Sequence, residues 1–171
     1  MKKWLSILLA LLCFSAYALA EDSLFALSAQ AMTPAADFAP VPLYCGATQG
    51  FYQHDNQTID LTQPFVCLGQ DDCWVMVAQG TADAFGPVGW IEGGLFDAAN
   101  LPELSFEDGF LAMIEEDAAA TNDPLNADGA WDVVLPRGTQ VTVLAKYDSF
   151  LYVQTEIDGI PARVFIPESV I

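Results

Sequence analysis

The sequence predicts an all-β protein built from two small modules. Short β-prone runs rich in Val, Leu, Phe and Trp are separated, at intervals of roughly ten residues, by Gly, Pro, Asn and Asp, a pattern typical of a sandwich or small barrel. No long helical period interrupts this pattern. Two stretches of the chain also repeat the same order of aromatic and aliphatic residues, and an internal repeat determines architecture.

The N-terminus is typical of a secretory signal peptide, which we assign to residues 1–20. Lys2 and Lys3 form a positive start, an uncharged apolar stretch follows, and an Ala-Leu-Ala sequence ending at Ala20 offers small residues where a signal peptidase reads. We therefore expect cleavage after Ala20 and a secreted or cell-envelope protein.

Two other interpretations of this terminus stay open. A transmembrane anchor is disfavoured because the apolar run of residues 5–17 is shorter than the roughly 20 residues that span a bilayer. A lipoprotein signal would acylate Cys13, but Leu12 stands where such sites have a small residue.

The charge of the chain excludes several classes of partner. It has 23 acidic and 5 basic residues, a formal net charge of −18, and loss of Lys2 and Lys3 with the signal peptide takes this to −20. Nucleic acid and anionic membrane surfaces are excluded because binding them needs a basic footprint. The hydrophobic content of 53% predicts a packed core rather than a disordered acidic tail.

The chain divides into a leader, two β-rich modules and a linker. Residues 21–40 carry no sustained period and include Pro34, so they predict a leader with at most a short helical turn. We assign the first module to residues 41–96, the linker to 97–110 and the second module to 111–171. The expected strands lie at residues 41–45, 64–68, 74–78, 88–91, 110–115, 131–135, 140–145, 150–156 and 162–166. Between the last two, Asp158-Gly159 predicts a tight hairpin turn.

An internal repeat relates the two modules at an offset of 76 residues. At this offset the Phe-Val-Cys-Leu sequence of residues 65–68 falls on the Val-Thr-Val-Leu sequence of residues 141–144. One residue is then lost in the following hairpin, after which Trp90 falls on Phe165. Identities are few, and chance matching of two β-rich segments is the alternative explanation.

The second module carries motifs by which the chain resembles the bacterial SH3-like family of exported β-barrels. Residues 135–144 are similar to the family's leucine, turn and glycine followed by alternating valines, and residues 150–153 resemble its aromatic strand. Residues 163–167 resemble its closing segment, although Val164 stands where glycine is usual. The resemblance implies an all-β chain of two tandem small SH3-like β-barrels, acting as a non-enzymatic binding module without a cofactor.

The same resemblance implies a ligand class, the peptide part of the cell wall or another exported envelope protein. SH3-like barrels that bind extended peptides dock them on aromatic-lined grooves between loops. The aromatic residues in predicted loops or strand ends are therefore the candidate ligand-binding residues: Tyr44, Phe51, Tyr52, Trp131 and Tyr147. Four other aromatic residues are expected to fill the cores: Trp74, Trp90, Phe150 and Phe165.

The cysteines left after cleavage all lie in the first module, with the single histidine, His54. In an extracytoplasmic compartment a disulfide between Cys67 and Cys73 is the preferred pairing, because the two residues flank one turn. Cys45 is then the odd thiol unless it takes one of the others as its partner, and three buried reduced thiols remain the alternative. A zinc site is disfavoured, since no two of these ligands stand within two to four residues of each other.

Catalysis and calcium binding were weighed and disfavoured. A wall peptidase in which His54 activates Cys45 would need a third orienting group and a separate catalytic domain. The Asn- and Asp-rich residues 122–129 lack the acids that an EF-hand loop needs at Pro124 and Leu135, so turn chemistry explains them more simply. A structural scaffold for an exported partner and a cysteine-dependent peptidase remain the alternatives to a binding module.

Overall fold

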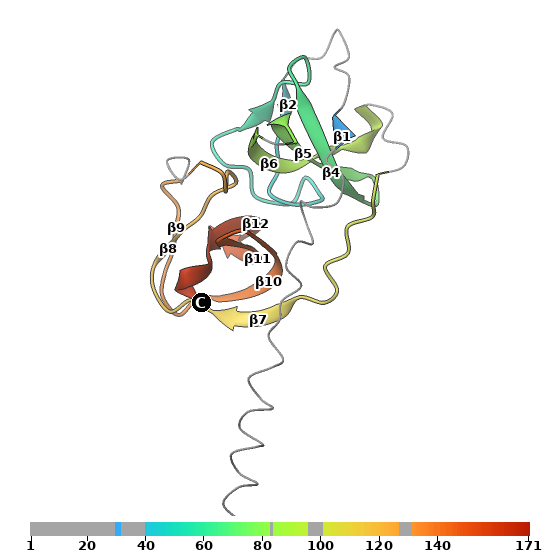
Figure 1. Ribbon diagram of the computed structural model, residues 1–171. Helices are drawn as coiled ribbons and strands as arrows, with labels where there is room; N and C mark the ends of the chain where they lie inside the picture. Colours follow the sequence, from blue (N-terminus) through green and yellow to red (C-terminus); the bar gives the residue numbers. More distant parts are fainter. Residues whose placement is uncertain (1–29, 32–39, 83, 96–100, 127–130) are drawn as a thin grey trace, which may run out of the picture.

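The structure is a computed structural model that describes residues 30–31, 40–82, 84–95, 101–126 and 131–171. These residues form strands, turns and short 3₁₀-helices, with no α-helix among them. Figure 1 shows two four-stranded sheets, one above the other. The prediction of an all-β protein is confirmed, whereas the predicted signal peptide and its cleavage site lie outside the described residues.

The first sheet has four antiparallel strands in the order β1-β4-β5-β6. Their bounds are β1 (Gln30–Ala31), β4 (Phe65–Asp71), β5 (Trp74–Thr81) and β6 (Ala84–Glu92). Three short elements accompany them: β2 (Val41–Pro42), β3 (Thr58–Ile59), which pairs with β2, and the 3₁₀-helix η1 (Gly93–Leu95). The hairpin between β4 and β5 turns at Asp72, whose φ of 54° is in the left-handed region that tight hairpin turns require.

The second sheet repeats this arrangement in the order β12-β11-β10-β7. Its strands are β7 (Phe110–Met113), β10 (Gln140–Tyr147), β11 (Phe150–Ile157) and β12 (Ile160–Pro167). The accompanying elements are β8 (Ala118–Ala119), β9 (Val134–Leu135), which pairs with β8, and η3 (Glu168–Val170). The predicted turn is confirmed, since Asp158 and Gly159 have φ values of 53° and 77° between β11 and β12.

The segment expected to be a leader contributes a strand. Gln30 pairs with Cys67 and Ala31 with Val66, so β1 lies beside β4 as β7 lies beside β10. A strand of two residues has no measurable alternation in sequence. Strand β1 forms because its two residues pair with the edge of β4.

The strand registers show that the internal repeat is structural. In the first sheet Val66 lies opposite Ala78, and in the second sheet Thr142 lies opposite Gln154, which is the same pair moved by 76 residues. The irregularity between Cys67 and Gly69 in β4 likewise recurs between Val143 and Ala145 in β10. The repeat therefore extends to backbone details that side-chain similarity alone does not specify.

The residue lost from the repeat is also accounted for. The pairing of β5 with β6 shifts between Ala78 and Gly80, whereas β11 and β12 pair without a shift. The extra residue lies in β6, where the three steps from Phe85 to Val88 match two steps from Ala78 to Gly80 in β5, and Gly80 has a φ of 113° at this irregularity. On the other side of this shift, Val88 of β6 lies opposite Ala78 of β5. The equivalent pair in the second sheet is Arg163 of β12 opposite Gln154 of β11.

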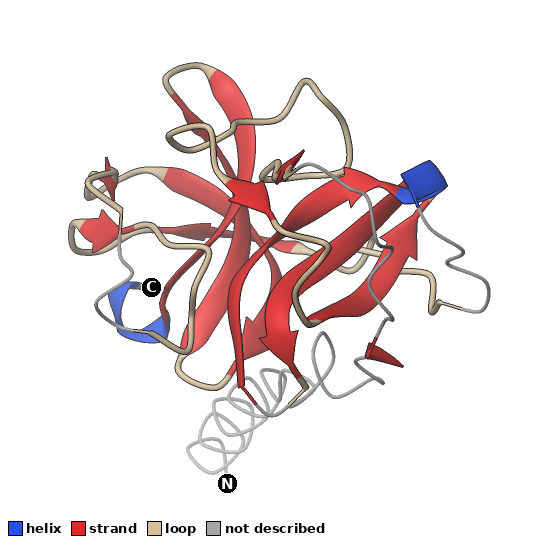
Figure 2. Ribbon diagram, turned by 90° about the horizontal axis from the view of Figure 1, so that it is seen from above, coloured by secondary structure: helices blue, strands red, loops and turns tan. Residues whose placement is uncertain are grey.

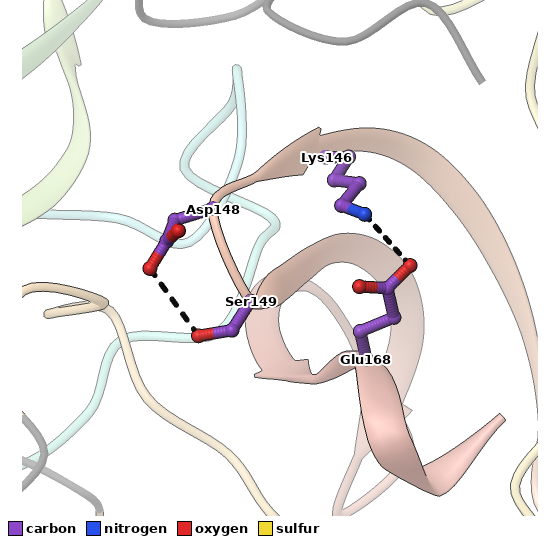
Figure 3. Close-up of polar contacts among 4 residues, drawn as sticks. All are labelled: Lys146, Asp148, Ser149 and Glu168. Atoms are coloured by element: carbon purple, nitrogen blue, oxygen red, sulfur yellow. Dashed lines mark hydrogen bonds and ion pairs between the residues drawn. The ribbon is translucent and has the colours of Figure 1, made fainter. Parts of the chain in front are cut away.

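In each sheet, an equivalent backbone hydrogen bond joins the end of the third long strand to the turn between the first two long strands. Gly93 N–H donates to the Cys73 carbonyl, and Glu168 N–H donates to the Ser149 carbonyl, both at 2.8 Å. In the second copy side chains reinforce the tie: Figure 3 shows Lys146 Nζ donating to Glu168 Oε1 at 2.8 Å. The pair is partly exposed, so it adds little stability beyond positioning η3.

Three apolar clusters hold the molecule together. We call each four-stranded sheet, with the short elements that accompany it, one half of the molecule. One cluster lies inside each half, around Val75 and Val77 in the first half and around their counterparts Leu151 and Val153 in the second half. The third joins the halves, and its buried members are Val66, Leu68, Trp74, Met76, Ala78, Phe85, Val88, Trp90, Ala145, Tyr152 and Phe165. The two sheets therefore share one central core in addition to their own.

Hydrogen bonds between the halves accompany this shared core. Trp90 Nε1 donates to the Tyr152 hydroxyl at 3.1 Å in a fully buried position, which satisfies both polar groups. Backbone bonds run from Arg163 N–H to the Cys45 carbonyl at 2.6 Å and from Tyr52 N–H to the Pro161 carbonyl at 2.8 Å. Figure 2 shows the molecule from above, with the strands of one half lying over those of the other.

Candidate functional site

The five aromatic residues predicted to bind ligand do not form one surface. Tyr44 is half-buried and meets Trp74 edge-on, with ring centroids 5.6 Å apart, and its backbone bridges to Trp90. Tyr147 is half-buried beside Phe85, at a centroid distance of 5.8 Å. Both residues therefore contribute to the packing between or around the sheets.

Two of the candidates, Tyr52 and Trp131, come together with His54. The imidazole of His54 stacks on the Trp131 indole at 4.3 Å with an interplanar angle of 13°, and the Tyr52 ring centroid lies 6.2 Å from that of Trp131. Trp131 is only 7% exposed and belongs to the core of the second half. Through these ring contacts, the loop that carries Tyr52 and His54 in the first half packs against Trp131 of the second half.

The remaining candidate, Phe51, lies beside a basic residue that the sequence did not single out. The guanidinium carbon of Arg163 is 5.3 Å from the centroid of the Phe51 ring. Phe51 also covers Gly46, where a Cβ atom would come within 2.0 Å of the Phe51 side chain. Phe51 therefore contacts Arg163, which lines the groove described below, but none of the five predicted aromatic residues is itself part of that lining.

The predicted disulfide is not formed, and all three cysteines of the described residues are free. Cys67 is buried within β4 and Cys73 is exposed beyond the end of that strand. Asp71, after which the turn to Cys73 begins, lies four residues beyond Cys67 along β4, an extended distance of about 13 Å. Disulfide-bonded Cα atoms lie less than about 7 Å apart. The turn brings Cys73 towards β5, not back towards Cys67.

Cys45 and His54 are neighbours but do not form a nucleophile-base pair. Burial raises the pKa of the Cys45 thiol to about 12, and the group that hydrogen-bonds this thiol is the backbone of His54, not its ring. The imidazole is stacked on Trp131, with Nδ1 buried and without a hydrogen-bond partner. At neutral pH the Cys45 thiol therefore stays protonated, whereas nucleophilic cysteines react as thiolates.

The Asn- and Asp-rich loop joins the halves. Asn122 Nδ2 donates to Gln57 Oε1 at 2.7 Å and to the Val88 carbonyl at 3.1 Å, and Val88 N–H donates back to the Asn122 carbonyl. Among the residues that the structure describes, in this loop and elsewhere, there is no group of three or more His, Cys, Asp or Glu side chains that could hold a metal ion.

A groove of about 410 Å³ lies where the two halves meet, and we call it the junction groove. Its floor is the outer face of the second sheet, and one wall is the segment that leads into β7. The lining residues that carry polar or charged groups are Asp71, Glu103, Ser105, Glu107, Thr142, Gln154 and Arg163. Leu104, Phe106 and Leu144 supply its apolar surface.

Arg163 is the only basic residue in this lining. Its guanidinium stacks over Phe106 at 4.7 Å, Nε donates to Gln154 Oε1 at 3.2 Å, and Nη1 lies 3.5 Å from Asp71 Oδ2. Nη1 is buried and lacks a hydrogen bond of good geometry. Aromatic faces and the carboxylate of Asp71 stabilise the positive charge of Arg163. Glu103 and Glu107 are exposed and make the mouth of the groove negative.

A second hollow of about 390 Å³ lies on the same sheet, and Gln154 lines both. Thr139, Gln140, Thr155, Glu156 and Pro161 complete the second hollow. Because directly opposite residues share a face of a sheet, Leu111, Thr142, Gln154 and Arg163 form one row across all four strands. The two hollows flank this row.

Sequence reasoning missed the groove, although the repeat contained a signal for it. The row Thr142, Gln154 and Arg163 corresponds to the row Val66, Ala78 and Val88 of the first sheet, which is buried and apolar. Polar residues in place of three core residues mark the part of this face that lines the groove, beside Tyr152 and Phe165, which are buried in the shared core.

Comparisons of the chain with protein-family models, with curated proteins and with solved structures found no match. None of the described helices is long and apolar enough to cross a membrane.

Proposed function

We propose that this protein is an exported, non-enzymatic binding module built from two tandem SH3-like β-barrels, and that it holds an extended peptide in the junction groove. Support for the fold comes from the short antiparallel strands, the conserved register of the repeat and the motifs of residues 135–144. Export rests on the signal-like sequence of residues 1–20.

The observation that carries the binding role is the polar row on the floor of the groove. The first sheet buries Val66, Ala78 and Val88 in the shared core, whereas the second sheet keeps Gln154 exposed at the matching place. A groove with apolar walls and a few convergent polar groups is the common form of a ligand site. The volume of about 410 Å³ fits one or two residues of a peptide.

The chemistry of the groove favours a peptide with a free amine group. Glu103 and Glu107 are exposed at the mouth and can pair with an amine, whereas Arg163 on the floor is already held by Asp71 and the Phe106 ring. Cell-wall peptide carries free amines, and so do the N-terminus and the lysine side chains of an envelope protein. Nucleic acid does not suit a groove with three carboxylates.

The absence of an enzymatic role is supported by the state of Cys45. Its thiol is buried with a pKa raised to about 12, and the His54 ring is committed to Trp131. A peptidase activity that disappears in Cys45→Ala would overturn this part of the proposal.

Retention on purified peptidoglycan tests the proposal. Gln154→Trp fills the shared floor of both hollows and Glu103→Gln with Glu107→Gln removes charge from the mouth, and we expect each change to lower retention at least about fivefold. Glu116→Gln, an exposed acid outside the groove, is the matched control and keeps full retention. Equal retention of all variants, with unchanged melting temperatures, contradicts the groove as the site.

The alternative role, a scaffold for an exported partner protein, is favoured by one observation. Leu111 and Met113 on β7 are 67% and 59% exposed, which is unusual for large apolar side chains on a strand. No retention on peptidoglycan, together with a stable complex with an exported protein, favours the scaffold.

A further inference from the structure

Strand β7 is the edge of the second sheet and presents apolar side chains to solvent. Phe110 and Ala112 turn towards the core of the second half, while Leu111 and Met113 lie on the opposite face at 67% and 59% exposure. Figure 1 shows β7 at the border of this half, with β10 on its inner side.

Among the described residues, none forms a backbone hydrogen bond with the outer edge of β7 over a short length. Ile114 N–H donates to the Thr139 carbonyl at 3.0 Å and its carbonyl accepts from Gly138, so Ile114 faces the β10 side. Since alternate residues of a strand present their backbone groups to the same side, Leu111 and Met113 direct theirs to the outer side. Glu115 N–H, which donates to the Val170 carbonyl at 2.7 Å, closes that side beyond Met113.

Acidic residues flank the open edge at both ends. Glu107 and Asp108 precede β7, and Glu115, Glu116 and Asp117 follow it, all of them exposed. Within the described residues none of the five takes part in an ion pair with a basic side chain. An apolar strand of four residues thus lies between two patches of unneutralised negative charge.

We propose that β7 accepts an extended segment of a partner protein as a fifth strand of the second sheet. The segment that fits has β-branched or apolar side chains at its centre and Lys or Arg at both ends. Its backbone would pair with Leu111 and Met113, its central side chains would cover theirs, and its basic ends would meet the two acidic patches. The site shares Glu107 with the junction groove but otherwise uses other residues, and this proposal does not depend on the proposed function.

Within the part of the chain that the structure describes, this strand has no edge protection. Folded proteins commonly protect an exposed edge with a Lys, a Pro, a bulge or a covering loop. β7 has the sequence Phe-Leu-Ala-Met, contains none of these residues and pairs with β10 without an irregularity. Self-association through the same edge would place like charges together and is disfavoured by a chain of net charge −18.

The test uses a synthetic peptide of sequence Lys-Lys-Val-Thr-Val-Thr-Lys-Lys and the full chain. A matched control peptide has Glu in place of every Lys, and a second control has Pro at the central Val. We expect the Lys peptide to bind at least about tenfold more tightly than either control, and to lose affinity with salt. In amide exchange, the Leu111 and Met113 N–H groups should become protected while that of Ala112, already bonded to β10, changes little.

A variant pair separates edge binding from general attraction. Met113→Lys puts a charge on the edge and should weaken the Lys peptide at least about tenfold, whereas Val134→Lys, at a 54% exposed apolar residue of β9, should leave it unchanged. Gln154→Trp should also leave it unchanged, so failure of the groove and failure of the edge are distinguishable. Equal binding of all peptides, unchanged amide exchange at Leu111 and Met113, or a dimer of the chain that Met113→Lys dissolves would each overturn the proposal.

Discussion

The first and second sheets share one register and differ in what covers the same face. In the first sheet the row Val66, Ala78 and Val88 is buried in the shared core, while in the second the matching row is polar and borders two hollows. Strand pairing is therefore compatible with either polarity on this face. One copy of the repeat therefore buries this row in the core, and the other leaves it beside two accessible hollows.

The two copies differ in a second way, in the glycines of the first. Gly69 stands where the second sheet has Ala145, and a Cβ there would lie 2.5 Å from Leu104 Cγ. Gly89 stands where it has Val164, and a Cβ there would lie 2.3 Å from Leu43 Cγ. Close approach of a neighbouring leucine, not backbone conformation, explains why glycine occurs in one copy only.

The largest expected effect comes from the residues at the centre of the shared core. Trp90→Ala should lower the free energy of unfolding by about 3–5 kcal/mol, because it removes a fully buried side chain. It also removes the donor to the Tyr152 hydroxyl, so its effect should exceed that of Phe165→Ala at the matching position. Urea unfolding measures both, and a smaller loss for Trp90→Ala than for Phe165→Ala contradicts the prediction.

Exchanging the polarity of the two rows sharpens the comparison directly. Ala78→Gln should cost about 3 kcal/mol, since a buried amide gains no partner among the apolar side chains of the shared core. The reciprocal change Gln154→Ala should stay within about 0.5 kcal/mol because that residue is exposed. Similar costs for the two substitutions, measured by urea unfolding, would show that the two faces are not covered differently.

The glycine difference predicts a smaller cost. Gly89→Ala should lower the free energy of unfolding by about 1–2 kcal/mol, because Leu43 must move and only part of this cost is offset by the reduced entropy of the unfolded chain. Val164→Ala in the second sheet is the matched core control, with a cost set by lost burial. A stabilising Gly89→Ala would mean that Leu43 accommodates the methyl group freely.

Alkaline pH should weaken the first half through its buried thiols. Burial raises the folded-state pKa of Cys67 to about 12 from 9.0, so the thiol binds a proton more tightly in the folded chain and stability falls as pH rises from about 9 to 12. At pH 10 the loss amounts to about 1 kcal/mol for this thiol. Cys67→Val, which copies Val143 of the second sheet, should remove that part of the loss between pH 7 and pH 10. If urea unfolding of Cys67→Val shows the same loss of stability between pH 7 and pH 10 as the unchanged protein, the assignment of this loss to the Cys67 thiol is wrong.

Much of the fold could be predicted from the sequence, because strand alternation and turn residues act locally. The repeat at an offset of 76, the single lost residue and the Asp158-Gly159 turn are all visible in the order of residues. Strand β1 could not be predicted in this way, since two residues carry no period and their pairing with β4 is a long-range contact.

The candidate site was predicted less well than the fold. The candidate aromatic residues fall in predicted loops or strand ends, but Trp131 and Tyr52 pack between the docked halves. Cys67 and Cys73 flank a turn in the sequence, but the strand separates one from the other. Arg163 gave no signal alone and became notable only opposite Gln154, with Asp71 and Phe106 brought near.

Side-chain alternation and residues that tolerate a positive φ specify the longer strands and their turns from the order of amino acids alone. The two-residue strand β1, the irregularities of register and the choice of which face is covered depend on the tertiary structure. That choice depends on contacts between residues far apart in the chain, such as Trp90 with Tyr152, and on the segment that packs over β10 to form the junction groove. Burial at such contacts is a property of the two docked halves and not of either strand pattern alone.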